Sequence, residues 1–188
     1  MNTDKHVNRE TKPLNVYFVL LSIGYLFLTA SLVLGRNTHL MNVAVFLKLL
    51  ASLGLAYKTR SKLMIVSSLL QIFSYIIVYI SGSMLMNAPE ISVYIIILQA
   101  DSLQVSYVLN GIADALLLFF TKKLAQTYAY RLIFQYMAII LAILTLLGTL
   151  GFFDRISLIL IIMVPVFELT IYALIAFIFI RYGLTKNK

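Results

Sequence analysis

Residues 92–120 read SVYIIILQADSLQVSYVLNGIADALLLFF, and they decide what kind of fold this chain can adopt. The stretch is apolar enough to enter a lipid bilayer, yet polar side chains recur in it at spacings of three and four. On a helix these positions share one face: Gln99, Ser102, Ser106, Asn110 and Asp114. Because hydrocarbon offers no hydrogen-bond partners, that face must turn toward other helices or a wet cavity. The sequence therefore predicts a membrane helix around which the other helices pack.

The composition of the whole chain indicates a membrane protein. Of its 188 residues 62% are hydrophobic, and the mean hydropathy is +0.97. Several apolar runs approach or exceed the roughly 20 residues that span a bilayer. The absence of cysteine excludes disulfides, thiolate metal sites and cysteine nucleophiles. The first apolar run is too long for a cleavable signal peptide and lacks a small-residue cleavage site, so we expect it to be retained.

Six apolar segments predict an all-α, polytopic bundle of six transmembrane helices. The predicted spans are residues 14–35, 40–57, 63–80, 88–120, 132–153 and 156–180. They form one transmembrane domain over residues 14–182, with a short mobile tail at 1–13 and another tail at 183–188. We expect a tight turn at 36–39, loops at 58–62, 81–83 and 122–131, and a short turn at Asp154 and Arg155.

The start of the fourth span has two interpretations. Asn87 and Glu90 resemble a capping box that opens a helix, with Pro89 between them. From residue 88 to residue 120 that helix would measure about 50 Å, which exceeds the roughly 30 Å hydrocarbon core. Residues 88–100 therefore either project beyond the bilayer or form a separate interfacial helix.

Basic residues divide unevenly between the two predicted sides of the membrane. The N-terminal tail, the 58–62 loop, the 122–131 loop and the C-terminal end hold twelve Lys and Arg, whereas the other side holds Arg36 and Arg155 only. By the positive-inside rule both termini are cytoplasmic. Topology and anionic headgroups thus account for the net charge of +8 without a nucleic-acid partner. We expect a multi-pass protein of a prokaryotic cytoplasmic (cell) membrane, with the lipid bilayer and a membrane or cytoplasmic subunit at the basic loops as partners.

Five of the six spans carry a polar residue near mid-depth. These residues are Tyr25, Lys48, Gln71, Asn110 and Glu168. The middle of the fifth span, around Leu141, is apolar. The simplest arrangement places spans one, two, three, four and six around a shared interior, with span five more peripheral.

Two opposite charges dominate this layer. A charge at a helix centre costs about 2.5–3.5 kcal/mol on insertion scales, and Lys48 and Glu168 would offset much of that cost by pairing. Asp114, about one turn nearer the cytoplasm, is a second possible partner for Lys48. A third alternative is that Glu168 is protonated, because burial disfavours a charged carboxylate. Pro165, one turn before Glu168, should kink the sixth span beside it.

The candidate ligand or ion site comprises Lys48, Asn110, Asp114 and Glu168. Intramembrane ionisable residues favour a functional site, but a buried pair that only fixes helix register explains them equally well.

The polar stripe also has a packing interpretation. Ser102, Ser106 and Gly111 would let helices approach closely, with Asn110 joining them through an interhelical hydrogen bond. Ser67, Gln71 and Ser74 form a weaker stripe on the third span, which favours packing. Asp101 lies nearly opposite the main stripe, and we expect it to be solvated at the outer interface.

Motifs for known chemistry are missing from the sequence. His6 and His39 lie in a tail and a turn, so no buried metal cluster is predicted. No nucleophile elbow or phosphate-binding glycine loop occurs, and no cofactor is predicted. Asp101 and Asp114 lie on opposite faces of one helix, so they cannot share a proton as an aspartyl dyad does. Asp114 with Glu168 is the acid pair on which an enzyme could rest; the sequence favours a protein that is not an enzyme.

Two functional hypotheses follow. The first is a small-molecule or ion transporter, or the membrane-embedded binding subunit of one, with a polar site at mid-bilayer depth. In length and span number the chain resembles the vitamin-binding S components of energy-coupling transporters, a likeness of architecture that no motif carries. The second is a non-catalytic subunit or regulator of a larger membrane complex, in which the buried charges are structural.

Overall fold

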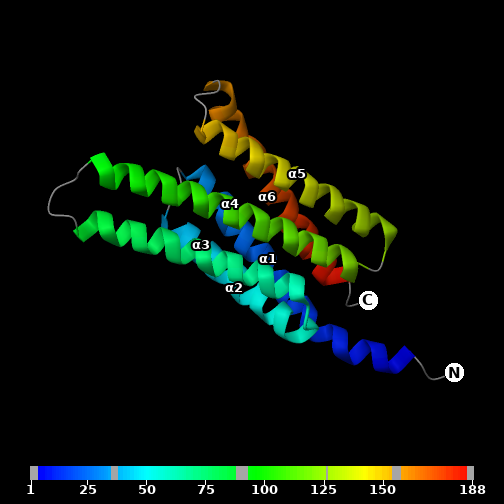
Figure 1. The fold of residues 1–188 in the computed structure, drawn as a ribbon. Helices are drawn as coiled ribbons and strands as arrows, with labels where there is room; N and C mark the ends of the chain where they lie inside the picture. The colour runs from blue at the N-terminus through cyan, green and yellow to red at the C-terminus, as the bar shows by residue number, and fades with distance from the viewer. Residues whose placement is uncertain (1–3, 35–37, 88–92, 126, 154–157, 186–188) are drawn as a thin grey trace. The chain divides into compact units, whose positions relative to one another are not determined.

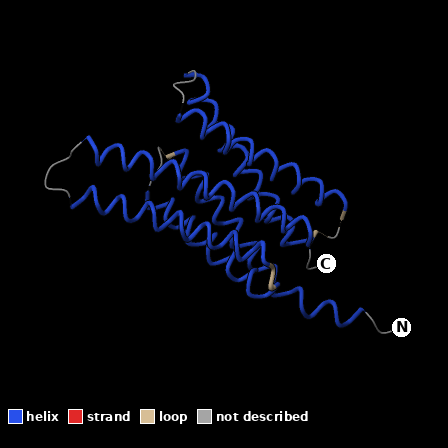
Figure 2. The backbone as a smooth tube through the Cα atoms, in the orientation of Figure 1, coloured by secondary structure: helices blue, strands red, loops and turns tan. Residues whose placement is uncertain are grey.

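The computed structural model describes residues 4–34, 38–87, 93–125, 127–153 and 158–185, and its regular elements are all helices (Figures 1 and 2). The helices follow one another with short connections. Their bounds are α1 Asp4–Val33, α2 Thr38–Thr59, α3 Lys62–Asn87, α4 Val93–Leu124, α5 Tyr128–Phe153 and α6 Leu158–Thr185. The predicted all-α class is confirmed.

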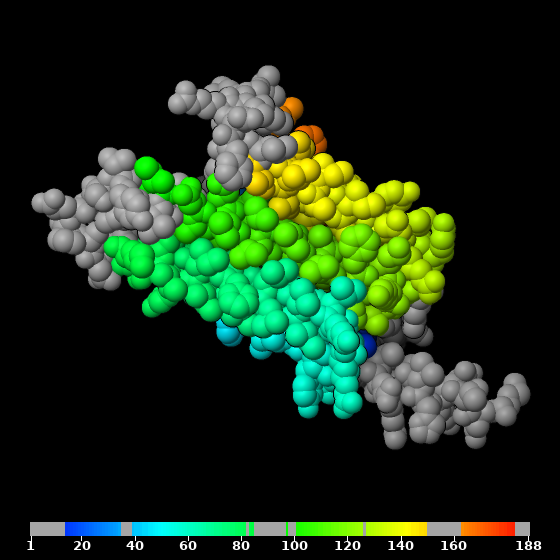
Figure 3. Space-filling view, in the orientation of Figure 1, coloured from blue at the N-terminus to red at the C-terminus, as the bar shows by residue number. Residues whose placement is uncertain are grey.

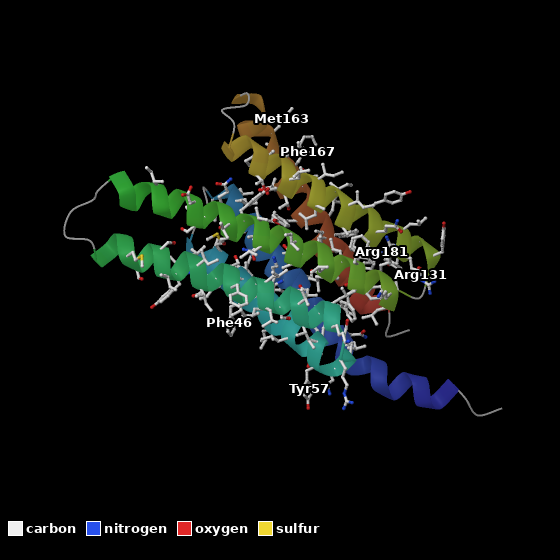
Figure 4. All side chains as sticks on the ribbon, in the orientation of Figure 1. Phe46, Tyr57, Arg131, Met163, Phe167 and Arg181 are labelled. Carbon is white, nitrogen blue, oxygen red and sulfur yellow. The ribbon has the colours of Figure 1, made fainter. Side chains whose placement is uncertain are left out.

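Each of the six helices contains a segment long and apolar enough to cross a membrane. These segments are Leu14–Val33, His39–Thr59, Lys62–Ser81, Asp101–Leu124, Tyr128–Thr149 and Met163–Tyr182. Large apolar side chains on them are exposed, including Phe46 (62%) and Phe167 (53%), both labelled in Figure 4. Water penalises such surfaces and lipid does not. The six helices therefore indicate a multi-pass integral membrane protein.

Several helix ends differ from the predicted ones. α1 begins at Asp4, so most of the predicted tail at 1–13 continues the helix that holds the first span. α5 begins at Tyr128, which places Arg131 in its first turn instead of at the end of a loop. Between α2 and α3 only Arg60 and Ser61 remain outside the helices. The predicted turn at 36–39 is wrong in its second half, because α2 already begins at Thr38 and includes His39. Residues 36 and 37 and the predicted turn at 154–155 fall outside the described residues.

The predicted loop at 81–83 is wrong, because α3 continues through it to Asn87. The Ser81 hydroxyl donates to the Val78 carbonyl (3.1 Å) and the Ser83 hydroxyl donates to the Ile80 carbonyl (2.8 Å). Serine hydroxyls that bond their own helix in this way are tolerated within it. Asn87 is therefore the last described residue of α3, and the rest of the predicted capping box lies outside the described residues.

The sequence left open whether residues 88–100 continue the fourth span or form a separate helix, and α4 answers this for residues 93–100. Residues 93–100 continue α4 as one helix with the span that starts at Asp101, so this part is not a separate helix. Residues 88–92 lie outside the described part. Asp101 itself is exposed, as predicted.

The chain divides into two compact units. The first unit comprises residues 1–65 and 165–188, and the second comprises residues 66–164. The first unit thus contains α1, α2 and most of α6, and the second contains most of α3 together with α4 and α5. The divisions fall inside α3 and, at Pro165, inside α6.

Within the first unit α1 packs against α2 and α6. Gly54 of α2 makes room for the Tyr17 ring, because a Cβ there would overlap it. On the other side of α1 the Ser22 hydroxyl donates to the Ala176 carbonyl (2.7 Å). The Phe18 ring meets the Tyr182 ring edge to face at 5.1 Å between centroids. The start of the first span therefore lies beside the end of the sixth.

Within the second unit α4 packs between α3 and α5, and Figure 3 shows these three helices side by side in cyan-green, green and yellow. A Cβ at Gly111 of α4 would overlap the Thr145 side chain of α5. Conversely, a Cβ at Gly148 of α5 would lie 2.5 Å from the Tyr107 hydroxyl of α4. Each helix thus receives a side chain of the other where a glycine leaves space.

Threonines in these apolar helices bond their own backbone. The hydroxyl of each donates to the carbonyl four residues earlier, at 2.6–3.0 Å: Thr29, Thr59, Thr121, Thr145, Thr149 and Thr170. The hydroxyl hydrogen is thus satisfied within the helix, as hydrocarbon surroundings require.

Candidate functional site

Lys48 of α2 is buried, with 4% of its surface exposed, in the first unit. A Cβ at Gly24 of α1 would lie 2.9 Å from Lys48 Cγ and 3.2 Å from the Ala44 carbonyl oxygen. The missing side chain at Gly24 therefore lets the lysine stem lie across α1. The ammonium ends 4.7 Å from the centroid of the Tyr25 ring, within the roughly 6 Å range of a cation–π interaction.

Tyr25 belongs to a column of aromatic rings between α1 and α6. Its ring stacks on the Tyr172 ring at 5.8 Å and on the Phe179 ring at 6.0 Å between centroids. Phe18, two turns earlier on α1, stacks on Phe179 at 5.8 Å. Tyr25 and Phe179 are fully buried. Contacts on several sides hold the Tyr25 ring that faces the Lys48 ammonium.

Glu168 lies on α6 in the same unit and is also buried, with 6% of its surface exposed. It precedes Tyr172 by four residues, so the two side chains share one face of the helix. Pro165, one turn earlier, lies inside α6 and leaves the Ile161 carbonyl without its usual helical donor. The carboxyl group of Glu168 and the cation–π pair of Lys48 and Tyr25 thus belong to one unit.

Asn110 and Asp114 lie on α4 in the second unit. The Asn110 amide donates to the Ser74 hydroxyl of α3 (2.5 Å), and the Ser74 and Ser106 hydroxyls lie 2.6 Å apart. Asp114 is buried, with 1% of its surface exposed. The predicted stripe is therefore a line of interhelical hydrogen bonds at Ser106 and Asn110.

The weaker stripe on α3 faces the same line. Ser67 donates to the Ala113 carbonyl (2.8 Å), and Ser74 donates to the Ser106 carbonyl (3.1 Å). Gln71 between them is buried. The predicted packing role is confirmed for Ser67 and Ser74, which bond α4.

The four predicted site residues thus divide between the units. Lys48 and Glu168 belong to the first unit, and Asn110 and Asp114 belong to the second. A ligand role for any of them stays a prediction, as does the shared interior of five spans. The acid pair of Asp114 and Glu168, on which an enzyme would rest, draws on both units.

Sequence reasoning missed Gly24 and Tyr172. A signal for each was present, because Gly24 adjoins the mid-depth Tyr25 and Tyr172 follows Glu168 by one helical turn. In the described part of the chain, no three His, Cys, Asp or Glu side chains gather to hold a metal ion.

No protein-family model matches the chain, and no curated protein or solved structure matches it either.

Proposed function

We propose that this protein is a small membrane transporter, or the membrane-embedded binding subunit of one, whose ligand or ion contacts Lys48 and Glu168. Asn110 and Asp114 belong to the second unit, and their ligand role stays a separate prediction. The observation that carries the proposal is the burial of a lysine and a glutamate in one three-helix unit, with the Lys48 ammonium over the Tyr25 ring.

The cost of these charges supports a role beyond packing. Each charge at mid-span costs about 2.5–3.5 kcal/mol on insertion scales, and apolar residues of similar size would avoid that cost. The second unit holds its helices together with neutral hydroxyl and amide groups, such as Ser74 and Asn110. Neutral groups thus join α3 to α4 at Ser74, Ser106 and Asn110, which favours a role beyond packing for the charges of the first unit.

The test is the identity of small molecules that co-purify with the protein in a mild detergent. The wild-type protein is compared with the Lys48→Met/Glu168→Gln double variant by mass spectrometry of the denatured samples. The matched control is Lys123→Met/Asp101→Asn, which removes one exposed charge of each sign. A molecule retained by the wild type and the control but lost from the double variant supports the proposal; equal retention in all three contradicts it.

The proposed topology places both termini in the cytoplasm, as the distribution of basic residues favours. Because the chain contains no cysteine, single cysteines report their side without background labelling. We expect Lys123→Cys to be blocked by a membrane-impermeant maleimide only after cell lysis, and Ser83→Cys to be blocked in intact cells. The opposite pattern would invert the topology.

A second candidate is a subunit or regulator that docks a partner at its basic turns. The α2–α3 turn favours it, because Tyr57 is 80% exposed beside the exposed Lys58 and Arg60. Figure 4 shows Tyr57 projecting from the end of α2. Loss of a co-purified protein from Lys58→Ala/Arg60→Ala, with small molecules unchanged, would favour this candidate over transport.

A further inference from the structure

The surroundings of Lys48 attract positive charge. Its ammonium lies 4.7 Å from the Tyr25 ring centroid, and the face of an aromatic ring carries partial negative charge. Glu168 supplies a carboxylate on the same α6 face as Tyr172, whose ring stacks on Tyr25. The first unit therefore contains two groups that favour a cation, the Tyr25 ring and the Glu168 carboxylate. The Lys48 ammonium is itself a cation beside the ring.

The approach of the Lys48 stem is built into α1. At Gly24 even one carbon would come within 2.9 Å of Lys48 Cγ, so a larger residue would press on the stem. The Tyr25 ring is held in turn by Tyr172 and Phe179. The Lys48 side chain thus extends from α2 across Gly24 and places its ammonium group beside the Tyr25 ring, which its own neighbours hold.

We propose that α1, α2 and α6 form a binding site for a small organic cation with an ammonium head, and that the Lys48 ammonium is its tethered occupant. The inference rests on the proposed function and names the class of its ligand. An entering ammonium head takes the place of Lys48 Nζ against the Tyr25 ring, in the unit that also holds Glu168.

The experiment removes the tether and supplies the cation. Lys48→Ala, purified in detergent, is heated with n-propylammonium chloride, with sodium chloride at the same ionic strength, and with 1-propanol as the neutral analogue. We expect n-propylammonium alone to raise the unfolding midpoint, by about 3 °C or more near saturation. The wild-type protein, in which the Lys48 ammonium competes for the same place, should show a smaller rise than Lys48→Ala. The Lys48→Ala/Glu168→Gln variant should lose the rise.

An unchanged midpoint of Lys48→Ala, or an equal rise with sodium chloride or 1-propanol, overturns the inference. If Lys48→Ala does not survive purification, the same comparison uses the monodisperse fraction recovered when membranes are solubilised with each additive. A higher recovery with n-propylammonium supports the site, and equal recoveries overturn it. Because this readout needs no natural ligand, its failure leaves the proposed function standing; equal co-purification from wild type and the Lys48→Met/Glu168→Gln variant would overturn that function instead.

Discussion

The helix pairs α1–α2 and α4–α5 use the same packing device with different side chains. In both pairs each helix carries a glycine that receives a residue of the other helix, and one of the two inserted residues is a tyrosine. The insertions are Tyr17 at Gly54 and Lys48 at Gly24 in the first pair, and Tyr107 at Gly148 and Thr145 at Gly111 in the second.

The difference lies in what the inserted groups do with their polar atoms. In α4–α5 both return to the backbone: the Thr145 hydroxyl donates to the Leu141 carbonyl (2.8 Å), and the Tyr107 hydroxyl donates to the Leu144 carbonyl (3.3 Å). In α1–α2 the Lys48 ammonium instead extends to the Tyr25 ring. The same packing thus serves only cohesion in one pair and positions a charge in the other.

The largest expected effect concerns the two buried charged residues of the first unit, Lys48 and Glu168. On the predicted pairing of Lys48 with Glu168, we expect Lys48→Met and Glu168→Gln each to lower the free energy of unfolding by about 3 kcal/mol, because each change leaves the other charge buried without a counter-charge. The double variant should recover most of that loss. Thr145→Val, the matched change in α4–α5, should cost less than about 1 kcal/mol. Denaturant titration in detergent measures all four, and strict additivity of the two charge changes would refute the compensation.

The glycines should give the next largest effect. Gly111→Ala and Gly54→Ala should each lower the free energy of unfolding by about 1–3 kcal/mol, because the added carbon overlaps Thr145 or Tyr17. Gly24→Ala should cost less, because the atom nearest the added carbon, Lys48 Cγ, would lie at 2.9 Å, whereas the nearest atoms at Gly54 and Gly111 would lie closer. Adding Thr145→Ala to Gly111→Ala should restore most of the stability. A Gly111→Ala protein as stable as the wild type would contradict the close approach of α4 and α5.

A smaller loss of stability is expected when the serines that form interhelical hydrogen bonds in each unit are replaced by alanine. Ser74→Ala should cost about 1 kcal/mol, because Ser74 contacts both Ser106 and Asn110. Ser22→Ala should cost about 0.6 kcal/mol, because its hydroxyl makes one bond to the Ala176 carbonyl. The control is Ser83→Ala, whose hydroxyl bonds its own helix at the Ile80 carbonyl. Thermal midpoints in one detergent rank the three, and a Ser83→Ala loss as large as that of Ser74→Ala would disprove the ranking.

The smallest effect concerns the turn after α2, compared with the turn between α4 and α5. α2 ends with Arg60 at φ 52°, a left-handed conformation that favours glycine. The α4–α5 turn is instead held by side-chain hydrogen bonds: Lys122 donates to Gln135 (2.7 Å), and Arg131 donates to the Ala125 carbonyl (2.9 Å). Arg60→Gly should therefore raise the free energy of unfolding by about 0.5 kcal/mol. Arg60→Ala, which keeps the Cβ, should give no such gain in the same titration.

Apolar runs in the sequence predicted the helical class and six candidate spans, because the bilayer imposes a length and a hydropathy that local sequence expresses. Helix ends were harder to predict. Ser81 and Ser83 have the composition of a loop, yet their hydroxyls bond the carbonyls of α3 and the helix continues.

The candidate site was predictable only in part. The rarity of charge in apolar spans singled out Lys48 and Glu168, and both are buried. The Tyr25–Tyr172 stack and the fit of Lys48 against Gly24 depend on the shapes of side chains on different helices. Periodicity within one helix carries no information on which partner helix lies opposite, so these contacts became visible only in the fold.

The backbone bonds of the threonines bear on how this chain enters a membrane. Thr170 is exposed on α6, yet its hydroxyl donates to the Val166 carbonyl (3.0 Å). Acyl chains around α6 therefore meet a methyl group and a hydroxyl whose hydrogen is already engaged, much as they would meet valine. During membrane insertion this segment should therefore behave as more hydrophobic than its residue types suggest. Thr170→Val should leave its insertion unchanged.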